Sequence, residues 1–340
     1  MSDKFVKTTA IAPANIAFVK YWGYRDEKLF LPYNSSISMN LDKCLTSTTV
    51  AWGVSDQDEY WLMDQSGSLQ PVVKKDKGKK FWRQIDRIKQ LAGVNLPVKI
   101  VSRNSFPHSA GIASSASAAA SLTLALLASV SLDQLWQDKT ELSRQVRLAG
   151  SGSAVRSVFD GFVEYQAGGD HQSSHAYQLA DESDWQLVDV VAVVQQTAKQ
   201  YSSTTGHRLA AANPFFQARI QQVERHLSAV RQAIAQHDFD LLGQTIEADT
   251  LSMHAVMLTS QPALIYWQAA TMELIHWTRQ ARAAGLPVYF TIDAGANVHL
   301  ITLPEYQDRL VRQLKQFDFV KQLLVNYPAK GACLSDQHLF

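Results

Sequence analysis

SFPHSAGIASSASAAASLTLAL (residues 105–126) joins a short polar segment to a long run of small and apolar residues. The run from 115 to 130 predicts a helix that is apolar on most sides and therefore mostly buried. The first turn of a helix has free backbone N–H groups and carries a partial positive charge. Glycine and small side chains at that point let the oxygens of an anion approach the backbone, which suits the segment to phosphate.

Two interpretations of this segment remain open from the residues alone. In the first, phosphate lies against Gly111, Ala113, Ser114, Ser115 and Ala116, and a serine hydroxyl adds a donor or one oxygen ligand to Mg²⁺. In the second, a serine merely caps a buried helix. The segment is not a Walker A loop, because it lacks the G-x-x-x-x-G-K-[ST] spacing.

Composition limits the class of protein. The chain has 340 residues, 46% of them hydrophobic, which is enough for two domains. With 32 basic and 31 acidic residues it lacks the basic excess of a nucleic-acid-binding protein, and the basic run at 74–80 is expected to be a solvated loop. No leader or membrane span is expected. Cys44 and Cys333 lie far apart, so we expect a cytoplasmic protein without a disulfide framework.

Periodicity predicts an α+β protein of two lobes, residues 1–185 and 186–340. In the first lobe we expect a hairpin from 46–54 and 58–63, helices at 81–93 and 140–150, a strand at 96–102 and a strand pair or strand-turn within 158–169. A buried strand at 185–194 follows the change of lobe. In the second lobe we expect helices at 214–238, 263–285 and 306–317, and strands at 287–292 and 297–302.

Three further segments carry side chains suited to chemistry. GSGSAVRS (150–157) offers flexible backbone, hydroxyl donors and Arg156, whose planar fork suits a carboxylate unless it is merely a surface arginine. TIDAGANVH (291–299) places Asp293 at the end of an apolar strand, where it either handles a proton or simply lies in a turn. Lys20 lies in the apolar stretch NIAFVKYWG (15–23) and therefore needs a partner.

These motifs together resemble a known family. Pro107, Gly111, Ile112 and the following Ser-Ser-Ala resemble the ATP phosphate loop of the GHMP kinase superfamily, with isoleucine at the usual leucine position. NIAFVKYWG with LPYNSSIS (31–38), GSGSAVRS and TIDAGANVH are similar, in that order, to segments of the diphosphomevalonate decarboxylases. The four motifs span most of the chain.

The resemblance implies the two-lobed α+β GHMP kinase fold, with an N-terminal lobe shared with ribosomal proteins and a ferredoxin-like C-terminal lobe. It implies ATP- and Mg²⁺-dependent decarboxylation of mevalonate 5-diphosphate to isopentenyl diphosphate in the mevalonate pathway of isoprenoid biosynthesis. Asp293 would orient or deprotonate the C3 hydroxyl, Arg156 would hold the carboxylate, Lys20 would support Asp293, and Ser203 would point into the site. A homodimer is left open; no nucleic acid or membrane partner is implied.

The resemblance also assigns binding residues. For the substrate they are Tyr21, Trp22, Gly23, Tyr24, Arg83, Ser151, Gly152, Ser153, Ala154, Val155, Arg156 and Thr204. For ATP they are Pro107, Gly111, Ala113, Ser114, Ser115, Ala116 and Ser117, with Ser115 as a Mg²⁺ ligand.

Several positions depart from the family pattern, mostly on the substrate side. Tyr24 stands where the family often has lysine, His207 where it often has methionine, and Ala296 where it often has proline. His108-Ser109 replaces a common Thr-Ala. The departures keep open a sibling enzyme or 3-kinase that acts on mevalonate 5-phosphate or mevalonate. Another GHMP small-molecule kinase and a non-enzymatic binding module are the remaining alternatives.

Overall fold

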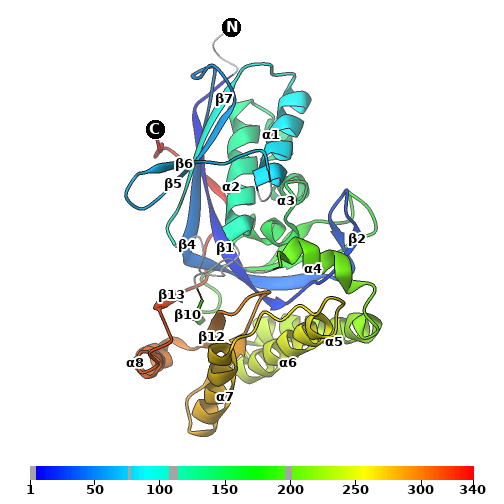
Figure 1. The fold of residues 1–340 in the computed structure, drawn as a ribbon, viewed down its shortest axis with the longest axis vertical. Helices are drawn as coiled ribbons and strands as arrows, with labels where there is room; N and C mark the ends of the chain where they lie inside the picture. Colours follow the sequence, from blue (N-terminus) through cyan, green and yellow to red (C-terminus); the bar gives the residue numbers. More distant parts are fainter. Residues whose placement is uncertain (1–4, 76–77, 107–113, 196–200) are drawn as a thin grey trace.

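The computed structural model describes residues 5–75, 78–106, 114–195 and 201–340 (Figure 1). The strands in these ranges are β1 (Thr8–Val19), β2 (Tyr24–Asp26), β3 (Leu31–Pro32), β4 (Ser36–Trp52), β5 (Glu59–Met63), β6 (Leu69–Pro71), β7 (Val98–Asn104), β8 (Phe162–Tyr165), β9 (Ala176–Ala180), β10 (Val188–Val193), β11 (Val288–Thr291), β12 (Val298–Thr302), β13 (Gln322–Asn326) and β14 (Cys333–Ser335). The helices are α1 (Lys79–Ala92), α2 (Ser114–Ser129), α3 (Lys139–Arg147), α4 (Ser203–Ala210), α5 (Phe216–Gln236), α6 (Phe239–Leu258), α7 (Ala269–Ala283) and α8 (Gln307–Leu314), with short 3-10 helices η2 (Asp133–Leu135), η3 (Gly152–Ser157) and η4 (Pro304–Tyr306).

The N-terminal lobe is built on one large sheet with strand order β14-β1-β4-β7-β5-β6, to which β8 and β9 are added beside β4. Helix α2 lies against this sheet and is buried along nearly its whole length, as its small residues predict. Its serines do not face water: Ser117 Oγ and Ser121 Oγ bond the hydroxyls of Thr46 and Thr48 at 2.7 and 2.8 Å. Buried hydroxyls paired in this way let the helix approach the sheet closely.

The expected hairpin of residues 46–54 and 58–63 is wrong. Strand β7 lies between β4 and β5, pairing antiparallel with β4 and parallel with β5. Alternating residues on both sides of a short polar segment fit a hairpin as well as they fit two strands that pair with a third strand. Strand β7 lies about forty residues after β5 in the sequence and pairs with both β4 and β5. The local pattern of residues 46–63 gives no sign of this distant partner.

The C-terminal lobe packs helices against an antiparallel sheet of order β11-β12-β10-β13. The long helix expected at 214–238 is confirmed as α5, and its apolar face is buried. Helix α6, which pattern analysis left unassigned, packs beside α5. The helix expected from residue 263 begins later, at Ala269, because Gln268 caps it in a reciprocal capping box with Thr271.

The two lobes meet in a shared core. Ile16, Phe18 and Met39 of the large sheet lie in one cluster with Leu227 of α5 and Ile246 of α6. Figure 1 shows β1 running from the upper helices α1–α3 to the lower helices α5 and α6. The chain then returns, because β14 pairs with β1. We propose that the lobes divide near residues 185 and 186, with the tail from β14 onward completing the N-terminal sheet. In the described ranges, no helix combines the length and apolar character that a membrane crossing requires.

Candidate active site

The site is centred on a lysine–aspartate pair at the junction of the lobes. Lys20 follows β1 and Asp293 follows β11, and Lys20 Nζ lies 2.8 Å from Asp293 Oδ1. The same ammonium donates to the carbonyl of Ala17 at 2.8 Å. The Lys20 side chain is only 3% exposed, whereas that of Asp293 is 28% exposed. The buried cation therefore fixes one carboxylate oxygen and leaves the carboxylate reachable by a ligand.

The electrostatics keep Asp293 ionised. Burial alone would raise the pKa of Asp293, but the charge and hydrogen bond of Lys20 outweigh it, helped by His299 and Arg156, so the pKa lies below its usual range. Arg156 therefore lies near enough to Asp293 for its charge to act on the carboxylate. An ionised carboxylate held by a buried lysine can orient a hydroxyl or accept its proton.

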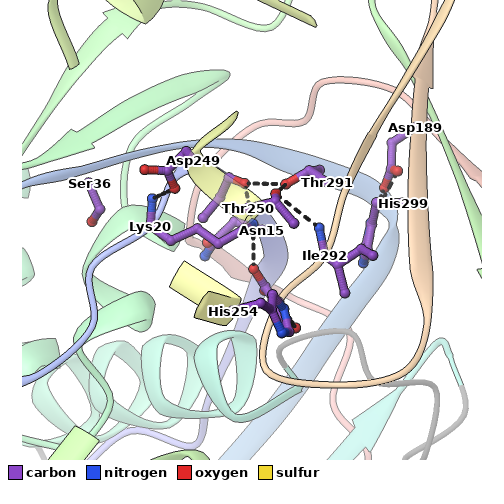
Figure 2. A network of polar contacts seen from close by, with 12 residues as sticks. Asn15, Lys20, Ser36, Asp189, Asp249, Thr250, His254, Thr291, Ile292 and His299 are labelled. Carbon is purple, nitrogen blue, oxygen red and sulfur yellow. Dashed lines mark hydrogen bonds and ion pairs between the residues drawn. The ribbon is translucent and has the colours of Figure 1, made fainter. Parts of the chain in front are cut away.

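A second set of charges, missed in the sequence, holds the backbone of Lys20. Its N–H donates to Asp249 Oδ2 at 2.8 Å, and its carbonyl accepts from Arg219 at 2.8 Å. Arg219 also pairs with Asp249, and the same carboxylate accepts from His226 Nδ1 at 3.0 Å. Figure 2 shows Asp249 beside Lys20. The sequence did contain a signal for this set: Asp249 lies between Ile246 and Met253 on the apolar face of α6. A charge on a buried face needs a partner.

Arg156 is likewise fixed from both sides. It lies in η3, is 3% exposed, and donates to Ser36 Oγ at 2.5 Å and to Asn15 Oδ1 at 3.1 Å. Asn15 is anchored in turn by Ser157 Oγ at 2.9 Å. Burial lowers the pKa of Arg156, and the neighbouring Tyr21 hydroxyl and Asp293 carboxylate oppose that effect. The interpretation of Arg156 as a merely exposed surface residue is therefore wrong.

The segment before Arg156 lies against Tyr21 and Arg83. A Cβ added to Gly152 would come within 2.5 Å of Tyr21 Oη, so only glycine allows this approach. A Cβ on Gly150 would lie 3.2 Å from the Arg83 guanidinium, which also stacks over Phe30. The hydroxyls of Ser151 and Ser153 lie 3.1 Å apart in the same segment, and Ala154 and Val155 are fully buried. The structure thus brings together most residues expected to bind substrate.

Helix α4 carries the expected serine and threonine. Ser203 and Thr204 form its first turn and are exposed, and Ser202 caps it by accepting from Thr205 N–H. No contact joins Ser203 to Lys20, Asp293 or Arg156 in the described residues. The roles of Ser203 and Thr204 therefore remain predictions.

The expected nucleotide loop falls partly outside the described residues. Pro107, Gly111 and Ala113 lie there, as does the His108-Ser109 departure. Ser114 and Ser115 begin α2 and are half-buried, whereas Ala116 and Ser117 are fully buried. Because Ser117 bonds Thr46, its hydroxyl serves the core, while Ser115 is the better placed of the two to meet a ligand.

Two buried histidines lie beside this centre. His254 of α6 is 1% exposed and its Nε2 contacts the carbonyl of Asp293 at 3.2 Å. His207 of α4 is 8% exposed and accepts the N–H of Gly23 at 3.0 Å. Burial lowers the pKa of each ring to about 3, with the charge of Lys20 adding to the effect at His254. Both rings are neutral in the folded protein at ordinary pH.

These histidines predict acid sensitivity. An unfolded histidine has a pKa near about 6.5, so the unfolded chain binds more protons than the folded one below that pH. The stability gained from burying neutral rings is present above this value and is lost as the pH falls toward 3. We expect the free energy of unfolding to drop by about 2 kcal/mol per histidine between pH 7 and pH 5.

Urea unfolding of the wild type and His254→Gln at several pH values measures this loss. Glutamine keeps a donor for the Asp293 carbonyl without a titrating ring, so the variant should show a shallower pH dependence. His276→Gln is the control, because that exposed ring is solvated in both states. Equal slopes for wild type and His254→Gln would contradict the expectation.

Comparison with known proteins identifies the family. Residues 12–176 match the model of the diphosphomevalonate decarboxylase-like N-terminal domain, and residues 189–332 match that of the mevalonate 5-diphosphate decarboxylase C-terminal domain. The diphosphomevalonate decarboxylase of Saccharomyces cerevisiae is 36% identical over 93% of this chain and 81% of that protein. The chain belongs to the diphosphomevalonate decarboxylase family. The two-lobed α+β GHMP kinase fold is thereby confirmed.

Two further relatives bear on the ligands of the decarboxylase family. A solved structure of MDDEF in complex with MVAPP, AMPPCP and magnesium has a TM-score of 0.88, with 34% identity over 98% of this chain and 99% of that one. The phosphomevalonate decarboxylase of Haloferax volcanii is 31% identical over 90% of this chain and 91% of that protein. Similar chains in the family thus carry names for two substrates that differ by one phosphate.

Proposed function

We propose that this enzyme decarboxylates mevalonate 5-diphosphate at the expense of ATP, giving isopentenyl diphosphate, ADP, phosphate and CO₂. The observation that carries the proposal is the partly exposed Asp293 carboxylate, which is ion-paired with the buried Lys20 and lies near enough to Arg156 for their charges to interact. The substrate carries a hydroxyl and a carboxylate. The Asp293 carboxylate can accept a hydrogen bond from the hydroxyl, and the Arg156 guanidinium can hold the carboxylate.

Each side chain has one task in the reaction. Asp293 orients the C3 hydroxyl and takes its proton as the oxygen receives the γ-phosphoryl group of ATP. The C3–O bond then breaks and phosphate leaves with the electron pair, so positive charge develops at C3. The C1–C2 bond electrons form the new C2=C3 double bond and CO₂ departs. Arg156, rigidly held by Ser36 and Asn15, keeps the carboxylate aligned for this step.

ATP and Mg²⁺ fit the donors that are present. The described residues contain no cluster of three or more His, Cys, Asp or Glu side chains able to bind a metal. Mg²⁺ commonly binds through substrate phosphates and one or two protein oxygens, so such a cluster is not required. Ser115 at the start of α2 would supply one hydroxyl, and the α2 N-terminus would supply N–H donors to phosphate. The metal would neutralise phosphate charge during transfer.

Ser115→Ala should raise the KM for ATP or the Mg²⁺ requirement by about tenfold, while the KM for the mevalonate compound stays within about twofold. Steady-state kinetics with each substrate varied measures the difference. Ser117→Ala is the matched control: it removes a hydroxyl two residues on, in the same helix, whose partner is Thr46. That variant should lose stability without a selective effect on ATP. If Ser115→Ala keeps wild-type ATP kinetics, the segment is only a capped helix.

A second candidate substrate is mevalonate 5-phosphate. Tyr24 favours this substrate, because the family often has lysine at that position and a phenol offers no positive charge to a second phosphate. The Haloferax volcanii relative is named phosphomevalonate decarboxylase. ADP and CO₂ release measured in parallel with the diphosphate and the monophosphate decides between them. Higher kcat/KM with the diphosphate supports the proposal. ADP without CO₂ from either compound would indicate a 3-kinase instead.

We also propose a cytoplasmic enzyme, in keeping with Cys44 and Cys333, which are both free thiols. A homodimer is the proposed assembly, and light scattering on the purified chain tests it. A single species at the mass of one chain would exclude the dimer at that concentration.

A further inference from the structure

Two of the departures from the family pattern, far apart in sequence, meet in the structure. Tyr24 follows the turn after Lys20, and His207 lies in α4, yet their rings stack with centroids 4.5 Å apart at 28°. The imidazole also stacks on Tyr21 at 4.8 Å and 16°, and contacts the Trp22 ring at 4.4 Å. One histidine therefore contacts all three aromatic rings of the segment 21–24.

His207 holds the backbone of this segment as well. Gly23 has a φ of +99° and is closely packed, since an added Cβ would lie 3.0 Å from Phe216. Its buried N–H donates to His207 Nδ1 at 3.0 Å. Burial lowers the pKa of His207 to about 3, so the ring keeps the lone pair that this bond needs. A protonated imidazole has no acceptor and could not make it.

The contacts lead from His207 to the reacting groups. The Tyr21 ring packs on His207 at one side and its hydroxyl lies against Gly152 at the other. The Tyr21 ring also lies beside that of Tyr24, with centroids 6.4 Å apart, and Tyr21 is near enough to Arg156 to influence the pKa of that guanidinium. Burial raises the pKa of Tyr24 to about 12, so both groups of the stacked pair are uncharged.

We propose that His207 is a positioning residue for substrate binding: it fixes Tyr21 and Tyr24 against α4 and so sets where the Tyr21 ring lies beside Gly152 and Arg156. Tyr24 and His207 then act as a coupled pair, which explains why both depart from the family pattern in one chain. The inference rests on the proposed function only for the identity of the substrate.

Three substitutions separate the two contacts of the ring. His207→Phe keeps the stack and removes the acceptor. His207→Asn removes the ring but keeps an acceptor at the position of Nδ1. His207→Met supplies the residue frequent in the family, which neither stacks as a flat ring nor accepts well. His276→Phe is the control for the loss of an exposed histidine elsewhere.

Steady-state kinetics with the whole enzyme should show a selective loss. We expect His207→Phe and His207→Met to raise the KM for the mevalonate compound about tenfold while the KM for ATP stays within about twofold. His207→Asn should recover part of this loss, remaining within about threefold of wild type. If His207 had only a structural role, the variants would lower the urea midpoint and affect both KM values alike, and that result would overturn the inference. Wild-type KM values in both His207→Met and His207→Phe would also overturn it.

Amide hydrogen exchange gives a readout that needs no activity. The Gly23 N–H should exchange faster in His207→Met and His207→Phe than in wild type or His207→Asn, because its acceptor is gone. If wild type releases no CO₂ from either mevalonate compound, the proposed function fails while this measurement still decides the positioning role. Unchanged exchange in all three variants would refute it.

Discussion

Asp293→Asn is expected to reduce turnover by at least about a thousandfold, the range that a positioned proton acceptor contributes. The amide keeps the shape of the carboxylate but cannot take the proton of the C3 hydroxyl. It also leaves the ammonium of Lys20, 3% exposed, without its counter-charge. Nucleotide affinity should change little, because the predicted ATP contacts lie at the start of α2. Single-turnover ADP release and equilibrium binding of a nucleotide analogue measure the two effects.

Asp58→Asn is the matched control. Asp58 accepts from Lys89 Nζ at 2.8 Å, the same distance as in the catalytic pair, but it lies beside β5 in the N-terminal lobe. The Asp58→Asn variant shows what the loss of a lysine–aspartate ion pair does by itself, so that any further effect of Asp293→Asn can be assigned to the Asp293 carboxylate. We expect Asp58→Asn to lower stability and leave kcat within about twofold. Asp293→Asn activity within about tenfold of wild type would remove Asp293 from its assigned role.

Arg156→Lys is expected to cost roughly 2 to 4 kcal/mol of transition-state stabilisation, a loss of about 30- to 1,000-fold in rate. Lysine keeps the charge but cannot reach Ser36 and Asn15 while presenting a fork to a carboxylate. The loss should fall mainly on C–C cleavage. ADP would then appear faster than CO₂, so both products are measured in one reaction mixture.

Arg147→Lys provides the control for removing a buried guanidinium. Arg147 is fully buried in the same lobe and contacts the carbonyl of Ser174 and the ring of His171, away from Lys20 and Asp293. Its variant should be destabilised yet keep ADP and CO₂ release equal. If Arg156→Lys also releases both products at the wild-type rate, Arg83 or Lys20 becomes the better candidate for holding the carboxylate.

Local sequence determined the elements whose pattern is self-contained. The small residues after Ser114 made a buried helix, and the apolar positions from Phe216 to Ile234 made α5, because helical spacing is a property of neighbouring residues. Asp293 and Arg156 were candidates from their segments alone, and the family resemblance turned them into predictions of a role. The family resemblance added the reaction.

Only the tertiary structure decided which distant groups meet. The pairing of β7 between β4 and β5 could not be seen from the alternation of residues, since period two fits any partner. Asp249 could be noticed in the sequence as a charge on the apolar stripe of α6, but only the fold shows that it and Arg219 bond the backbone of Lys20. Tyr24 and His207 were two separate departures in the sequence and became one stacked pair. Burial and contact depend on residues hundreds of positions away, which is why the sequence predicted the reacting groups but not what holds them in place.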